Sequence, residues 1–336
     1  MEVLTSTEHS RVDETCKPEI ANVLSVEKNV NSVDKAGNIL LDATQSLEAR
    51  FRALFVLRNL KCDSSVRYIA KCFGDSSSLL KHELAYCLGQ MQNSSAVPYL
   101  IDVLEDKTQE PIVRHEAAEA LGAIADISVV DLLAKYTKDE SREVAETCQI
   151  ALNRIKWLSD RSNESAELNS IFDSVDPAPA NTEKGIGIDA LESTLVNEDL
   201  SLWERYKAMF TLRNLSASDE LATKALAKGL KCAKSGALFR HEIAYVLGQI
   251  QSASVVNELA GSLANVDESP MVRHECADAL GAIATPECMR ILRRELFARA
   301  AKWRWIWRNT SAPTNFNTPK LNEINLLCFP FDEMVC

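Results

Sequence analysis

VRHEAAEALGAIA, at residues 113–125, returns almost unchanged as VRHECADALGAIA at residues 272–284. Another stretch, HELAYCLGQMQ at 82–92, returns at the same offset of 159 residues as HEIAYVLGQIQ. Farther upstream, SLEARFRALFVLRNL at 46–60 returns as SLWERYKAMFTLRNL after only 155 residues. The chain therefore contains a long internal duplication. The four-residue difference predicts a longer loop between Leu215 and His241.

Each half of the chain also contains a shorter repeat. Its unit is Arg or Lys, then His-Glu, then a stretch rich in Ala, Leu and Gly, and it recurs after 33 residues. Apolar residues in HEAAEALGAIA follow the i, i+3, i+4, i+7 spacing of one helix face, and strand patterns are absent. Paired helices at this period resemble HEAT and related HEAT-like repeats. We predict an all-α, HEAT-like helical-repeat solenoid in two duplicated lobes related by a pseudo-twofold axis.

The repeats divide the chain into five predicted parts. We expect a loosely ordered leader at 1–36, an N-terminal lobe at 37–158 and a C-terminal lobe at 188–292. Between the lobes, residues 159–187 lose the helical periodicity and gain Ser, Asn, Asp, Pro and Gly, which predicts a flexible linker. Residues 293–336 show no repeat and form a divergent tail.

Charge and composition limit the classes of function. The 336 residues include 37 Lys and Arg against 48 Asp and Glu, a net charge of -11, which disfavours nucleic acid and suits a cationic partner. The N-terminus lacks the basic and apolar regions of a secretory signal, and no apolar run is long enough to cross a membrane. We expect a cytoplasmic protein whose ten cysteines are reduced and mostly buried.

Four of the five histidines directly precede a glutamate. Each pair occupies the same position of its repeat, so stacking should bring the two pairs of one lobe together. The pairs are His82-Glu83, His115-Glu116, His241-Glu242 and His274-Glu275. Adjacent helix residues differ by about 100° in direction, so one glutamate per lobe is expected to serve another purpose than metal binding.

Two histidines and one carboxylate per metal form the ligand set of non-haem Fe(II) oxygenases. Two such sets predict two irons, which could divide the reduction of dioxygen between them. The lack of thiolate ligands argues against structural zinc, and the lack of an HExxH spacing argues against a zinc protease. A metal-free alternative is that one ancestral Arg-His-Glu was copied four times as a helix start. The fifth histidine, His9, lies in the polar leader, where we expect it to be solvated.

Other duplicated residues have structural and functional interpretations. The glycines seven residues after each histidine, Gly89, Gly122, Gly248 and Gly281, predict close helix packing. Tyr86 and Tyr245 lie on the histidine face, where either support of the site or packing is expected. For Arg58 and Arg213 we expect ion pairs between repeats or helix caps.

These features together resemble the deoxyhypusine hydroxylase family. Four His-Glu pairs in two duplicated lobes, with KHELAYCLGQ and VRHEAAEALGAIA, carry the resemblance, which spans about residues 46–290. The resemblance implies a di-iron monooxygenase with two Fe(II) ions per chain, which uses O2 to hydroxylate the deoxyhypusine side chain of a translation initiation factor. Its iron ligands would be His82, His115 and Glu116 in one lobe and His241, His274 and Glu275 in the other. Glu83 and Glu242 would orient the substrate, whose cationic amines suit an acidic protein.

The tail departs from the family. After Leu292 the expected last repeat is replaced by a sequence that contains Trp303, Trp305 and Trp307 among basic residues. A solenoid that lacks its last repeat exposes the preceding one, which here carries His274 and Glu275. Two alternatives to the hydroxylase remain at this point: a non-enzymatic HEAT-like scaffold for a protein partner, and a chromophore lyase of the related repeat class.

Overall fold

The helices form two columns that stand face to face. The computed structural model describes residues 32–160, 172–181 and 185–295. The first lobe contains α2 (Leu47–Leu60), α3 (Asp63–Ala70), α4 (Ser78–Met91), α5 (Val97–Glu105), α6 (Pro111–Ile124), α7 (Val130–Tyr136) and α8 (Arg142–Asp160). The second contains α9 (Ile188–Val196), α10 (Leu202–Leu215), α11 (Glu220–Ala227), α12 (Ala237–Ile250), α13 (Val256–Ala264) and α14 (Pro270–Ile283).

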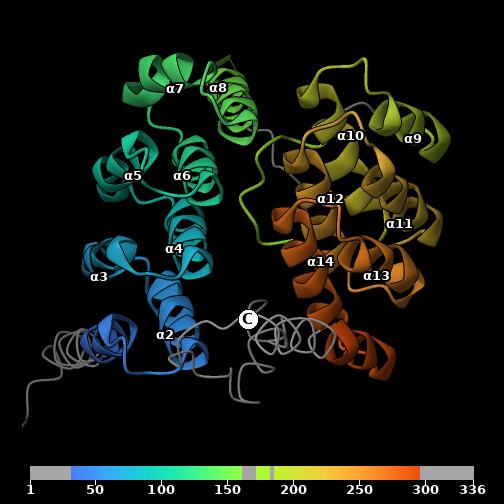
Figure 1. Ribbon diagram of the computed structural model, residues 1–336. Helices are drawn as coiled ribbons and strands as arrows, with labels where there is room; N and C mark the ends of the chain where they lie inside the picture. Colours follow the sequence, from blue (N-terminus) through green and yellow to red (C-terminus); the bar gives the residue numbers. More distant parts are fainter. Residues whose placement is uncertain (1–31, 161–171, 182–184, 296–336) are drawn as a thin grey trace, which may run out of the picture.

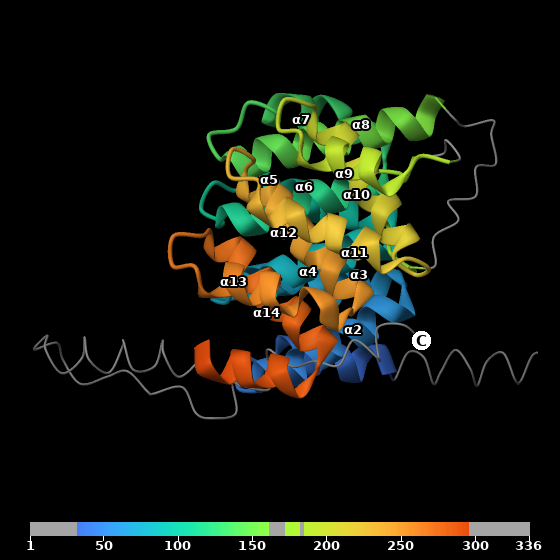
Figure 2. The same ribbon diagram turned by 90° about the vertical axis from the view of Figure 1, so that its right-hand side faces the viewer.

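The even-numbered helices form the inner faces of the two lobes. Figure 1 shows α4, α6 and α8 opposite α10, α12 and α14, with the odd-numbered helices on the outside. Figure 2, turned by 90°, shows the second lobe in front of the first. No strand occurs among the described residues, so the predicted all-α class is confirmed. The pseudo-twofold axis between the lobes stays a prediction.

Helix boundaries follow from local capping chemistry. The Ser46, Ser77 and Ser201 side chains accept hydrogen bonds from the first turns of α2, α4 and α10. Proline, which suits the first turn, opens both α6 and α14. Five inner helices end at a residue in the left-handed conformation: Lys61, Gln92, Ala125, Gln251 and Ala284. The duplication therefore preserves the ends of α4 and α6 in α12 and α14, whereas α10, the copy of α2, ends at Ser216 in the right-handed conformation.

Four arginines join the start of an inner helix to the end of the helix before it. Each guanidinium Nε donates to the carbonyl oxygen of a leucine ten residues earlier, at 2.8 to 3.0 Å. The pairs are Arg50–Leu40, Arg114–Leu104, Arg205–Leu195 and Arg273–Leu263. The last carbonyls of a helix have no partner within the helix, so these arginines satisfy them and fix each helix pair.

Glycines allow the inner helices to stack closely. A Cβ on Gly89 would lie 2.8 Å from the Cα of Ala120, and one on Gly122 would lie 2.7 Å from the Cβ of Ala151. At Gly248 the corresponding distance to the Cα of Ala279 is 3.1 Å. The predicted packing role is confirmed at these three positions, and for Gly281 it stays a prediction.

The four extra residues of the second lobe are divided between two loops. Residues 61–62 connect α2 to α3, whereas residues 216–219 connect α10 to α11. Residues 75–77 precede α4, whereas residues 232–236 precede α12. The prediction of a lengthened loop is thus confirmed, and the helices themselves keep their lengths.

Each lobe has its own apolar core, and both cores reach past the expected boundaries. Ile150 of α8 and Ala178 belong to the core of the second lobe. Residues 32–41 are helical, and Val33, Ala36 and Leu40 of this helix are buried in the first lobe. Part of the expected leader is therefore ordered. The five-part division stays a proposal, and residues 296–336, with the tryptophan cluster, lie outside the described residues.

Residues 172–181, here called the connecting segment, are part of the expected linker. Their backbone forms hydrogen bonds with the first lobe and the Asp176 side chain with the second, and Ala178 is 1% exposed. This part is anchored rather than flexible, because a buried arginine of α10 and a glutamine of α4 hold it.

Two expectations from composition concern membranes and cysteines. None of the described helices combines the length and the apolar character that a membrane crossing requires. The seven cysteines in the described part of the chain are free, and all but Cys62 are buried.

Candidate metal centre

The four histidines of the His-Glu pairs gather between the two lobes. His82 on α4 lies beside His115 on α6, with ring centroids 5.6 Å apart. Across the lobes, the His82 ring lies 5.9 Å from that of His241 and 6.1 Å from that of His274. The His115 ring lies 5.6 Å from that of His241. The cluster is therefore shared by both lobes and not divided into two distant sites.

Carboxylates from the neighbouring helix approach the imidazoles. Glu116 Oε2 lies 3.2 Å from His82 Nε2, and Glu275 Oε2 lies at the same distance from His241 Nε2. Glu83 Oε2 is 4.0 Å from Nδ1 of its own neighbour His82. In the first lobe Glu116 therefore lies closer to His82 than Glu83 does, and the expectation that one glutamate of each lobe stands apart from the metal ligands stays a prediction.

Two groups of side chains have ligand atoms close enough to hold a metal ion. In each group the candidate atoms lie within 4.8 Å of one another. The groups are His82, His115 and Glu116 in the first lobe, and His274, Glu275 and Asp278 in the second. The first group has the three residues expected from the sequence. The second contains Asp278, whose Oδ2 is 3.3 Å from His274 Nε2, where the sequence predicts His241.

The donor atoms of the cluster fit a metal. Both ring nitrogens of His82, His115 and His241 are buried without a hydrogen-bond partner among the described residues, and so is Oε1 of Glu242. Buried polar atoms in proteins nearly always have a hydrogen-bond partner, so buried imidazoles that lack one, two of them 3.2 Å from a carboxylate oxygen, fit a site for a metal ion. Nitrogen and carboxylate oxygen together suit a first-row divalent cation.

Burial governs the protonation of these side chains. Desolvation lowers the pKa of His82 to about 4 and holds that of His115 well below its ordinary value. Desolvation and nearby carboxylates raise the pKa of Glu83 to about 7, and desolvation with Glu275 raises that of Glu116 to about 8. Neutral imidazole is the form that binds a metal, while protonated carboxyl groups would release protons when a cation arrives.

Comparison with known proteins identifies the family. A deoxyhypusine hydroxylase of Rattus norvegicus is 54% identical to this chain over 261 residues, which are 78% of this chain and 84% of that protein. This chain belongs to the deoxyhypusine hydroxylase family. A deoxyhypusine hydroxylase of Homo sapiens is 53% identical over 77% of this chain and 83% of that protein. Membership of this hydroxylase family confirms the predicted enzyme class, a monooxygenase.

A solved structure shows the same architecture. The structure of human deoxyhypusine hydroxylase in complex with glycerol matches this chain with a TM-score of 0.78 and 46% sequence identity, covering 93% of this chain and 97% of that chain. Residues 80–106, 113–139 and 272–296 match the model of the PBS lyase HEAT-like repeat. The predicted HEAT-like solenoid is thereby confirmed, and the matched segments include His82, His115 and His274.

Sequence reasoning passed over two acidic residues of this deoxyhypusine hydroxylase family member. Glu119 and Asp278 follow His115 and His274 by four residues, so they lie one helical turn along the same face. Desolvation raises the pKa of Asp278 to about 7 and that of Glu119 well above its ordinary value. Their i, i+4 spacing from the histidines was enough to predict that both carboxylates lie on the histidine face.

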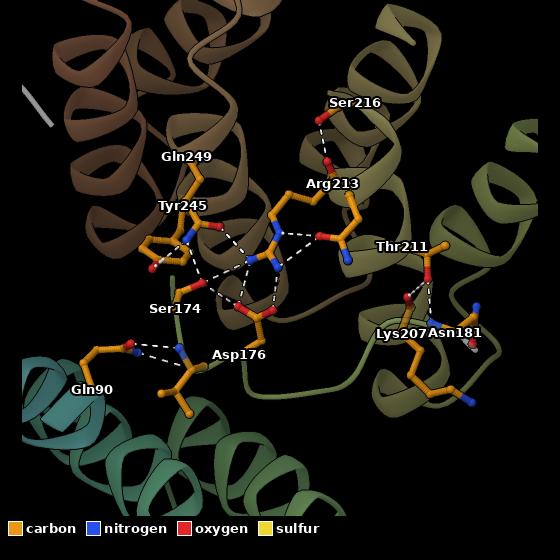
Figure 3. A network of polar contacts seen from close by, with 12 residues as sticks. Gln90, Ser174, Asp176, Asn181, Lys207, Thr211, Arg213, Ser216, Tyr245 and Gln249 are labelled. Atoms are coloured by element: carbon orange, nitrogen blue, oxygen red, sulfur yellow. Dashed lines mark hydrogen bonds and ion pairs between the residues drawn. The ribbon is translucent and has the colours of Figure 1, made fainter. Parts of the chain in front are cut away.

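Tyr245 and Arg213 belong to one polar network, which Gln249 links (Figure 3). The Tyr86 and Tyr245 hydroxyls are 3.0 Å apart and join α4 to α12. Arg213 forms an ion pair, as expected, but its partner is Asp176 of the connecting segment and not a residue of a neighbouring repeat.

Proposed function

We propose that this chain hydroxylates the deoxyhypusine side chain of a translation initiation factor to form hypusine, with O2 as oxidant and two Fe(II) ions per chain. The observation that carries the proposal is the pair of opposed ligand groups between the lobes. It occurs in a chain about half identical to proteins named deoxyhypusine hydroxylase. Neither a scaffold nor a chromophore lyase requires such a pair of groups.

The proposed ligands are those expected from the sequence. His82, His115 and Glu116 would hold one iron, and His241, His274 and Glu275 the other. Asp278 is an additional carboxylate within reach of the second iron. When bound, the irons supply the redox chemistry that activates dioxygen for insertion into a C–H bond.

The substrate is proposed to approach from the side of Glu83. The Glu83 side chain is 20% exposed, whereas Glu242, its duplicate, is 3% exposed as a residue. The side chains of His274 and Asp278 are also accessible, at 17% and 36% exposed. His115, the duplicate of His274 in the first lobe, is fully buried. Deoxyhypusine carries cationic amines, so carboxylates at an open side would attract and orient them.

The opposite side of the centre is closed. Burial, together with the nearby charges of Glu119, Glu116 and Asp176, holds the pKa of Glu242 well above its ordinary value. Tyr206, 1% exposed, also lies near Glu242 and Glu119. Closure on this side would exclude water from the reacting centre, while Glu242 orients the inner part of the substrate.

The test is oxygen incorporation by the reconstituted protein. The purified chain is loaded anaerobically with Fe(II), mixed with the deoxyhypusine-bearing factor and exposed to isotopically labelled dioxygen. We expect mass spectrometry to find one labelled oxygen atom in the modified side chain. The control replaces His82, His115, His241 and His274 with alanine and should incorporate none. Iron-loaded protein that binds the factor but transfers no oxygen would overturn the proposal. The cytoplasm remains the proposed location.

A further inference from the structure

The separation of the two ligand groups depends on how the lobes are placed. Imidazole rings from different lobes lie 5.6 Å apart at His115–His241 and 5.9 Å apart at His82–His241, close to the 5.6 Å within the first lobe at His82–His115. Each ligand group is built within one lobe. A shift of one lobe against the other would therefore leave each group intact but change the distance between them.

The connecting segment is fixed to the second lobe through Arg213. This arginine is fully buried, and its Nη1 and Nη2 donate to the two carboxylate oxygens of Asp176 at 2.7 and 2.5 Å. Its guanidinium carbon also lies 4.6 Å from the centre of the Phe172 ring. Gln249 on α12 accepts from Arg213 and donates to Ser174. A bidentate, buried ion pair of this kind gives a single geometry.

The same segment is fixed to the first lobe through Gln90. Its side chain accepts from the Val175 nitrogen at 2.8 Å and donates to the Val175 carbonyl at 3.3 Å. Arg154 on α8 donates to the Asp176 carbonyl at 2.9 Å. Three consecutive residues, 174–176, thus contact four helices, two from each lobe. Figure 3 shows the contacts with Gln90, Arg213 and Gln249.

The network reaches the metal centre through the tyrosine pair. Gln249 donates to the Tyr245 hydroxyl, which lies 3.0 Å from the Tyr86 hydroxyl. The glutamines and tyrosines follow the cluster histidines by eight and four residues on α4 and α12, so they share one helix face with them. The motif His-Glu-x-Ala-Tyr-x-Leu-Gly-Gln therefore carries both metal ligands and the residues that join the lobes.

The two copies of the arginine have diverged. Arg213 is fully buried against the connecting segment, whereas Arg58, its duplicate, is half-buried, donates to its neighbour Asn59 and lies 5.5 Å from the Phe55 ring centre. Arg58 is therefore a matched control for Arg213, because it is the same residue type at the duplicated position but lies in different surroundings.

We infer that the connecting segment sets the distance between the two metal-ligand groups, with Gln90, Asp176, Arg213 and Gln249 as positioning residues. The inference rests on the proposed function in so far as two metals act together. It assigns a role in the reaction to four residues that belong to neither ligand group.

The experiment measures the lobe separation without reference to metal. Spin labels are attached through ketone-bearing amino acids at positions 127 and 266, which are 70% and 73% exposed in the first and second lobes. The test variants are Asp176→Asn with Arg213→Met, which removes the ion pair without leaving an unpaired buried charge, and Gln90→Met. Arg58→Met is the control. Circular dichroism establishes that each variant is folded.

We expect a narrow label-to-label distance distribution in the unmodified chain and in Arg58→Met, and a broader one in both test variants. In the iron-loaded protein, the variants should keep the iron content, lose magnetic coupling between the irons in Mössbauer spectra, and show kcat lower by about tenfold to a hundredfold with KM unchanged.

Folded test variants with an unchanged distance distribution would overturn the inference. A different outcome is that the distance distribution broadens in the variants but the unmodified chain binds no iron. That outcome would contradict the proposed function, and the connecting segment would then only hold the lobes together. A fall in kcat with an unchanged distance distribution would also contradict the role in setting the separation.

Discussion

The hydroxyls of Tyr86 and Tyr245 lie 3.0 Å apart, although the two residues are separated by 159 positions in the sequence. Each is the copy of the other, and each follows a cluster histidine by four residues. Residues related by the duplication therefore meet across the lobe interface. The two tyrosines are both half-buried, whereas other duplicated residues, such as Arg58 and Arg213, differ in burial, and such pairs provide matched variants in which one copy serves as the control for the other.

Each lobe should hold its metal with its own ligands. His115→Ala is expected to lower the iron content from about two to about one per chain, because the second-lobe group keeps all its ligands. Elemental analysis of the purified protein measures this, with His9→Ala as the control. Loss of both irons would show that the site forms only as a unit.

Substitutions of Glu83 and Glu242 should differ in their effects on KM and kcat. Glu83→Gln removes a carboxylate on the open side, so KM should rise at least about tenfold, the worth of one hydrogen bond to a charged group. Iron content should stay the same. Glu242→Gln, on the closed side, should lower kcat with a smaller change in KM. Steady-state kinetics decides this, and equal KM values in the two variants would contradict an open and a closed side.

The Arg114–Asp139 ion pair should make the free energy of unfolding depend on pH in the acidic range. Two hydrogen bonds from Arg114, at 3.1 and 2.7 Å, hold the pKa of Asp139 below its ordinary value. A depressed pKa stabilises the fold above the ordinary Asp pKa of about 3.9, and this stabilisation is lost as pH falls through the folded-state pKa.

Asp139→Asn should therefore lower the free energy of unfolding by about 3 kcal/mol at pH 7 and by much less near pH 3. Urea denaturation at the two pH values measures the difference. Glu140→Gln, which breaks an exposed contact with Lys107, should leave stability unchanged at both. A loss in Asp139→Asn that is the same at both pH values would refute the assignment.

Helix spacing at Gly122 should not tolerate a methyl group. The new Cβ would meet the Ala151 Cβ at 2.7 Å, so Gly122→Ala should destabilise the protein by about 1–3 kcal/mol. Gly261→Ala on α13 meets open space and should stabilise it by about 0.5–1 kcal/mol, because alanine restricts the unfolded chain. Thermal denaturation compares the two, and shifts in the same direction would disprove close packing at Gly122.

The repeat architecture and the histidine cluster could be predicted because they depend on periodicity. His82 and His115 occupy the same position of adjacent repeats, so stacking alone places them together, 5.6 Å apart. The approach of His82 to His274 follows from how the lobes face each other, which no repeat period encodes. Asp278 was within reach of sequence reasoning through its spacing from His274.

The connecting segment shows where local composition is a poor guide. Ser174 and Asp176 lie in a polar sequence that is typical of flexible linkers. Their order comes from Arg213 and Gln90, residues far away in the chain, which supply the partners that local sequence lacks. Tertiary contacts of this kind override composition.

The loop at residues 232–236 makes the two halves of the molecule unequal. Arg142 of the first lobe donates to the Lys234 carbonyl at 3.3 Å, and Gly236 lies so close to the Glu146 carboxylate that a Cβ there would overlap with it. The shorter loop of the first lobe instead holds Asp75, which pairs with Arg50 inside its own lobe. The longer loop therefore contacts α8 of the other lobe, and a chain built from two copies of the first half would lack this contact between the lobes.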